Sequence, residues 1–178
     1  MKKQAPPIPD DRPILPFETA QAWDTWLAKH GGSSPGIYIK IAKKDSGIRS
    51  VTYPEVALCY GWIDAIKRSF DEEWFLQKFL PRKTRSIWSE INKKKVQALI
   101  KAKLMRPAGL AAVEQAKANG EWDKAYAPAR TITVPPDLGS ALKKNKKAAA
   151  FFKTLSGSNR YAILHRLHTA KKEETRAK

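Results

Sequence analysis

Cysteine is nearly absent from this sequence. Cys59 is the single cysteine among 178 residues, which excludes an intrachain disulfide and a zinc site built on two or more thiolates. Long hydrophobic runs are missing as well, because no stretch approaches the length of a membrane-spanning helix. The N-terminal segment MKKQAPPIPDDRP contains no apolar core of a secretory signal. These absences predict a cytoplasmic protein that is not transmembrane.

Acidic residues are scarce relative to basic ones. Asp and Glu number 17 against 34 Lys and Arg, which gives a formal net charge of +17 and a pI of about 10.0. Such a charge attracts polyanions and speeds encounter with them. Nucleic acid, bound without sequence specificity, is one candidate partner, and an anionic membrane surface or an acidic protein surface is another. Two interpretations stay open: an anionic partner, or a basic surface that only keeps the chain in solution.

Signatures of common enzyme classes are lacking too. Walker A, Rossmann and nucleophile-elbow patterns do not occur. Cys59 lies on an apolar predicted helix, which is typical of a buried, inert thiol. His165 and His168 have the i, i+3 spacing of two metal ligands, but no usual third ligand stands nearby. We therefore expect no cofactor and no metal, and we do not favour an enzyme.

The composition is that of an ordinary folded domain. Hydrophobic residues make up 42% and aromatic residues 10% of the chain, which is enough to build a core. Residues 1–16 contain five prolines and are expected to form a flexible arm. Residues 17–126 are expected to form an α+β core, and residues 127–178 a strap and C-terminal helices of the same domain.

The first half of the chain reads as one helix followed by strands. Trp23, Trp26 and Leu27 have helical spacing. Residues 36–44 alternate between apolar and polar, as in a half-buried strand, and IRSVTY (48–53) is the expected partner in a hairpin. Thr52 and Glu55 form a capping box for a short helix.

Two more strands are expected at WIDAIKRSF (62–70) and EEWFLQKFLP (72–81). A helix remains an alternative for the second, because neither of its faces is cleanly polar.

The second half reads as helices. Ser89 is a plausible N-cap, and a further helix is expected from Pro107 to a glycine stop at Gly120. Helices are also expected around 138–155 and 158–172, and the last residues should fray. The predicted fold class is α+β: an N-terminal helix, a small antiparallel sheet at about 36–80, then a mainly helical C-terminal half.

Three motifs follow one another along the chain: GWID (61–64), PRKTRSIWSEIN (81–92) and LMRPAGLAAVEQAKANGEW (104–122). With them the chain resembles the bacteriocin-protection family, also called the YdeI/OmpD-associated family, from about Trp23 to the C-terminus. The resemblance implies a bacterial protein linked to envelope stress, to resistance against bacteriocins or cationic peptides, and to an outer-membrane porin. It implies no reaction. Lys103 departs from the family pattern, which has a glycine there.

The best candidate site is the basic segment before the helix at Ser89. Its cations are Arg82, Lys83 and Arg85, and its polar residues are Ser86, Ser89 and Asn92. A helix N-terminus with nearby cations can bind an anion. The alternative is that the serines only cap the helix and the cations are solvated.

Asp64 and two tryptophans complete the list of candidate ligand-binding residues. Asp64 could act as a general base or anchor a polar ligand, but we favour an ion pair with Arg82 or Arg85. Trp62 and Trp88 are either core residues or platforms on which a base stacks.

The sequence thus favours a non-enzymatic, stress-linked binding protein with an anionic ligand or partner. The alternatives are an enzyme on a small phosphorylated or carboxylated substrate, and a non-specific nucleic-acid-binding regulator.

Overall fold

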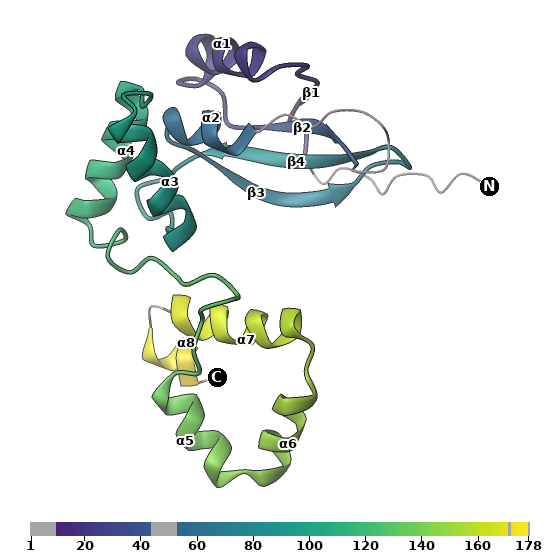
Figure 1. Ribbon diagram of the computed structural model, residues 1–178, viewed down its shortest axis with the longest axis vertical. Coiled ribbons are helices and arrows are strands. Elements are labelled where there is room, and N and C mark those ends of the chain that lie inside the picture. Colours follow the sequence, from purple (N-terminus) through teal and green to yellow (C-terminus); the bar gives the residue numbers. More distant parts are fainter. Residues whose placement is uncertain (1–9, 44–52, 171, 178) are drawn as a thin grey trace. The chain divides into compact units, whose positions relative to one another are not determined.

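The structure, a computed structural model, describes residues 10–43, 53–170 and 172–177. Its strands and helices, in chain order, are β1 (Ile14–Leu15), α1 (Ala20–His30), β2 (Ile37–Ala42), α2 (Tyr53–Cys59), β3 (Trp62–Ser69), β4 (Trp74–Pro81), α3 (Glu90–Lys101), α4 (Pro107–Ala118), α5 (Pro136–Lys144), α6 (Lys146–Thr154), α7 (Gly157–Thr169) and α8 (Glu173–Ala177) (Figure 1). The chain forms two compact units, a sheet unit of residues 1–86 and 95–119 and a helical unit of residues 87–94 and 120–178. None of the described helices is both long and apolar enough to cross a membrane.

Within the described residues, the sheet unit is built on a four-stranded sheet in the order β1-β2-β4-β3. β4 pairs with both β2 and β3 in antiparallel orientation, and Ile37 of β2 lies opposite Phe79 of β4. The pairing of β3 shifts between Asp64 and Lys67, which marks a β-bulge. β3 is therefore an edge strand with an irregular middle.

Most of the expected architecture is confirmed. The α+β class holds, β2, β3 and β4 lie within the predicted range 36–80, and the chain from Glu90 onward is mainly helical. The segment 72–81, for which a helix remained an alternative, contributes a strand. Of the expected hairpin partner at 48–53, residues 48–52, including the capping residue Thr52, lie outside the described residues, and Tyr53 begins α2 instead of ending a strand.

The expectation that the fold begins with a helix is wrong, because β1 precedes α1. β1 has two residues between Pro13 and Pro16, which is too short for any alternation to show. It pairs in parallel with β2, and the Tyr38 amide donates to the Pro13 carbonyl at 2.9 Å. The sheet is consequently not purely antiparallel, and only the distant partner strand reveals β1.

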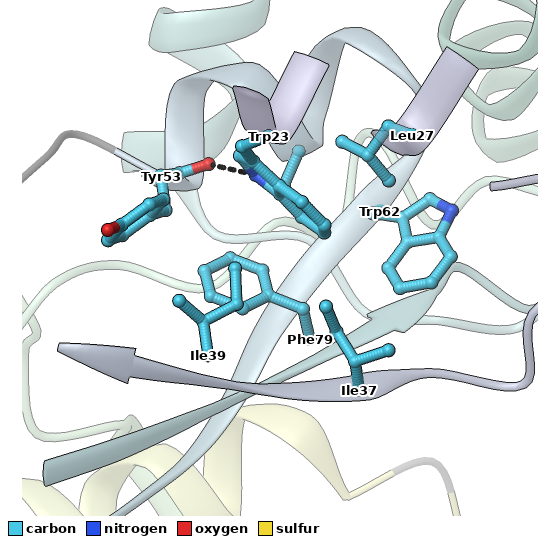
Figure 2. Close-up of a cluster of buried hydrophobic side chains, with 8 residues drawn as sticks. Trp23, Leu27, Ile37, Ile39, Tyr53, Trp62 and Phe79 are labelled. Carbon is cyan, nitrogen blue, oxygen red and sulfur yellow. Dashed lines mark hydrogen bonds between the residues drawn. The ribbon is translucent and has the colours of Figure 1, made fainter. Parts of the chain in front are cut away.

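One face of the sheet carries the main core. Figure 2 shows side chains of β2 and β4 pointing toward the side chains of α1 and α2. The core residues are Trp23, Leu27, Ile37, Ile39, Tyr53, Ala57, Trp62 and Phe79. Burial of a large apolar side chain stabilises the fold by roughly 1.5–3 kcal/mol. The Trp23 indole also donates to the Tyr53 carbonyl at 3.1 Å, so its polar atom is satisfied inside this core.

Two glycines allow α4 to lie close to the end of α2. Gly61 has a φ of 73°, in the region that favours glycine, and a Cβ there would lie 3.0 Å from the Ala108 carbonyl oxygen. A Cβ on Gly109 would lie 2.2 Å from the Cys59 carbonyl oxygen. The Arg106 amide donates to that same oxygen at 3.0 Å. The motifs around Gly61 and Gly109 therefore meet in space and have a packing role.

The helical unit departs from expectation at two points. The helix expected at 138–155 is divided at Asn145, whose side chain accepts from the Ala148 amide at 3.0 Å and caps α6. Within the C-terminal segment that was expected to fray, residues 173–177 form α8. Arg176 of α8 pairs with the Asp137 carboxylate of α5, and its guanidinium also donates to the Leu167 carbonyl of α7. A single basic residue thus fastens α8 to two other helices.

Candidate functional site

The basic segment 82–86 is an ordered loop at the end of β4. The Arg82 amide donates to the Gly61 carbonyl at 2.9 Å. Within the loop, the Lys83 amide donates to the Ser86 hydroxyl and the Ser86 amide to the Lys83 carbonyl, both at 2.9 Å. The Asn119 side chain donates to the Thr84 carbonyl from the end of α4. The loop is therefore held from both the sheet and a helix.

The loop presents its cations outward. Lys83 and Arg85 are exposed, whereas Arg82 and Ser86 are half-buried. Among the described residues, the side chains of Lys83 and Arg85 have no acidic partner. The groups that this loop supplies are cations, a hydroxyl and backbone amides, all of which suit an anion. It supplies neither a general base nor an activated nucleophile.

The predicted helix start at Ser89 is confirmed. The Ser89 hydroxyl accepts from the Asn92 amide at 3.1 Å, α3 begins at Glu90, and Ser89 is only 8% exposed. The hydroxyl is thus used as a cap. Trp88, Ser89 and Asn92 belong to the helical unit, and the loop 82–86 belongs to the sheet unit. The candidate residues consequently fall into two groups.

Both tryptophans of the candidate site are core residues. Trp62 is 1% exposed, and its indole donates to the Gly31 carbonyl at 3.2 Å. Trp88 is 2% exposed, and its ring meets the Trp122 ring with centroids 4.9 Å apart. Neither offers a free face for a stacked base. The polar residues that flank Trp62 and Trp88 in the sequence did not indicate this burial. The residues that bury the two tryptophans are distant along the chain.

The favoured interpretation of Asp64, an ion pair with Arg82 or Arg85, is wrong. Asp64 is exposed, and its side chain has no partner among the described residues. The reason is its place on the edge strand β3, immediately before the bulge. The apolar neighbours in the sequence suggested burial, but β3 is largely exposed after Ile63.

The lysines at the start of α3 are not simply solvated. The Lys93 ammonium lies 5.2 Å from the centroid of the Trp122 ring, and Lys95 pairs with Glu55 at 2.5 Å. Burial raises the pKa of the nearby Cys59 thiol, so that thiol stays protonated at neutral pH. The contacts of Lys93 and Lys95 offset part of the cost of placing cations where the helix dipole prefers acids.

A second group of cations was missed by the sequence interpretation. On the sheet face opposite the core, Lys40 and Arg68 lie on either side of Leu76 in one cross-strand row. The Lys40 ammonium lies 4.8 Å from the Trp74 ring centroid. The Arg68 Nε is buried without a hydrogen-bond partner among the described residues. The available signal was the presence of Lys40, Arg68 and Trp74 within three predicted strand segments.

These features define an α+β protein with a preorganised cationic loop. Residues 15–112 match the model of a domain of unknown function, DUF8412, and because this match spans more than half of the chain, the chain belongs to that family. Residues 131–178 match the model of bacteriocin-protection, YdeI or OmpD-associated proteins. The suspected resemblance is therefore confirmed through the C-terminal segment. No curated protein and no solved structure matches the chain.

Proposed function

We propose that this protein is a non-catalytic binding protein of the bacteriocin-protection type and that its partner is anionic. The observation that carries the proposal is the loop 82–86, which holds Lys83 and Arg85 exposed and, among the described residues, without acidic partners. The match of residues 131–178 to the bacteriocin-protection model supports the stress-linked part of the proposal.

The ordered state of the loop favours binding. Its backbone is fixed by hydrogen bonds to Gly61, Ser86 and Asn119, so ordering it costs little on association. The net charge of +17 adds long-range attraction for a polyanion, which raises the association rate at low salt. Together these features favour a partner with closely spaced negative charges.

The test is a salt titration of polyanion binding. The double variant Lys83→Ala, Arg85→Ala is compared with Lys143→Ala, Lys144→Ala, which removes the same charge from exposed positions of α5. The probes are a short random-sequence DNA duplex and heparin. We expect the loop variant to lower the slope of log K against log salt by about two, since each lost phosphate contact removes about 0.9. Equal losses in both variants would show a diffuse basic surface and overturn the proposal.

A nucleic-acid-binding role is favoured by a separate observation on the sheet. On the sheet face opposite the core, the Lys40 ammonium lies 4.8 Å from the centroid of the Trp74 ring. On the other face, the Lys67 ammonium lies 3.5 Å from the centroid of the Phe75 ring, so each face carries one such pair. Cations beside aromatic rings suit a single strand, whose phosphates and bases they contact together. In that case single-stranded DNA should bind more tightly than heparin of the same charge. Equal affinity would leave only the general polyanion proposal.

A further inference from the structure

A cavity of about 520 Å³ lies within the helical unit and is lined by residues of α5, α7 and α8. These three helices are labelled in Figure 1. Its lining residues are Asp137, Leu138, Ala141, Ile163, Arg166, Leu167, Thr175, Arg176 and Ala177. The volume falls in the range of small-molecule sites. All nine residues belong to the segment that matches the bacteriocin-protection model.

The cavity wall is mainly apolar and poorly covered by the protein itself. Leu138, Ala141, Ile163, Leu167 and Ala177 supply the apolar surface. None of these five is buried, and α5, α6 and α8 contain no buried residue. Ile163 is 39% exposed. A ligand with an apolar part would remove this surface from water, and binding would gain in proportion to the area covered.

The polar groups of the wall leave one positive charge uncompensated. Arg176 is occupied by the Asp137 carboxylate, with 2.9 Å between Nη2 and Oδ1, and this contact lowers the pKa of Asp137. Arg166 lines the same cavity, and its guanidinium has no hydrogen bond or ion pair with any described residue. The Thr175 hydroxyl lies in the wall as well. Glu173 and Glu174, the two acids of α8, are exposed and lie outside this lining.

We infer that this cavity binds a small amphipathic anion, namely a medium-chain aliphatic carboxylate. The two carboxylate oxygens match the planar fork of the Arg166 guanidinium. The unpaired Arg166 guanidinium balances the single charge of a carboxylate. The aliphatic chain of the ligand lies among Leu138, Ile163 and Leu167. This site is separate from the loop 82–86, and the inference does not depend on the polyanion partner proposed above.

The first experiment compares three ligands on the full chain by titration calorimetry. Decanoate, below its critical micelle concentration, carries both chain and charge; decanol carries only the chain, and acetate only the charge. We expect saturable binding of one decanoate, at least tenfold weaker binding of decanol, and no measurable binding of acetate. Decanol that binds as tightly as decanoate, or acetate that matches it, would overturn the inference.

Variants then locate the site. Arg166→Gln should weaken decanoate about tenfold and leave decanol unchanged, while Ala141→Phe should fill the cavity and weaken both. Arg130→Gln is the matched control, because Arg130 is an exposed arginine of the same unit outside the cavity lining. Equal losses in the Arg166 and Arg130 variants would contradict the assignment. If Arg166→Gln fails to fold, Ala141→Phe and the ligand comparison on the unchanged chain decide the question. The variant Lys83→Ala, Arg85→Ala should bind decanoate normally, which separates this inference from the proposed function.

Discussion

Asp10, which lies in the segment before β1, contacts three side chains of the sheet unit. Its carboxylate pairs with Lys78 at 2.5 Å and with Arg12 at 2.9 Å, and it accepts a hydrogen bond from the Tyr38 hydroxyl at 3.4 Å. The hydrogen bond from Lys78 is the main cause that lowers the pKa of Asp10 from 3.8 to about 2. Asp10 therefore links the segment before β1 to β2 and β4.

Asp10→Asn should reduce stability in a defined pH range. Because the folded pKa lies below the unfolded one, the contribution of Asp10 is fully present above pH 3.8 and is lost as the pH falls to about 2. The melting temperature of the variant should thus lie below that of the parent at pH 7, and the two should converge near pH 2. Asp11→Asn, at an exposed acid next to Asp10, is the control and should change little at any pH. A constant difference down to pH 2 would contradict the assignment.

Asp64→Asn should leave stability almost unchanged. Removing one partner of a buried ion pair costs roughly 3–5 kcal/mol, but Asp64 is exposed and, among the described residues, unpaired. Surface substitutions of this kind stay within about 0.5 kcal/mol. Chemical denaturation of both proteins measures the difference. A loss of several kcal/mol would mean that the carboxylate has a partner after all.

At the scale of single elements, replacing Gly109 of α4 or Gly139 of α5 with alanine should have opposite effects on stability. Alanine in a helix is ordinarily more stable than glycine by roughly 0.5–1 kcal/mol. Gly139→Ala should show this gain, because a Cβ there meets nothing within 4 Å. Gly109→Ala should lose roughly 1–3 kcal/mol, because its Cβ would collide with the Cys59 carbonyl. Melting curves of the two variants test the pair, and a gain in both would show that α4 does not lie against α2 as described.

The elements that could be predicted are those whose pattern is complete within their own residues. The segment 36–44 that contains β2 alternates between apolar and polar residues in the sequence, α3 has its cap at Ser89, and α4 has Pro107 at its start and Gly120 after its end. β1 was missed because two residues between prolines form a strand only by pairing with β2. α8 was missed because Arg176 fastens it through Asp137, which lies 39 residues away in the sequence.

The candidate site could be predicted from the sequence only in part. The exposed cations of the loop 82–86 could be recognised from their density in the sequence. The burial of Trp62 and Trp88 could not, because it depends on Gly31 and Trp122, which are distant in sequence. The cavity could not be foreseen either, since its lining combines α5, α7 and α8, which are separated in the sequence.

At the scale of the whole molecule, the excess of positive charge opposes folding. Several acids are already engaged in ion pairs, among them Asp24 with Arg106 and Glu114 with Lys117, and the formal net charge is still +17. Repulsion between like charges destabilises a compact chain.

Added salt should therefore raise the melting temperature of the protein. The screening length falls from about 30 Å at 0.01 M to about 8 Å at 0.15 M, so repulsion between distant cations weakens first. Scanning calorimetry over this range measures the effect. A melting temperature that falls with salt would mean that the attractive ion pairs outweigh the excess charge.

Each of the two units contains closely spaced tryptophans, whose spectroscopic signal can report on that unit without an added label. In the sheet unit, Trp23 stacks on Trp26 at 5.4 Å, and Trp62 meets both rings edge-on. In the helical unit, Trp88 and Trp122 form a separate pair at 4.9 Å. Indoles this close couple excitonically and give circular dichroism bands that vanish when the rings separate. Each unit consequently carries an unlabelled optical reporter, and replacing Trp88 and Trp122 with phenylalanine would isolate the signal of the three tryptophans in the sheet unit.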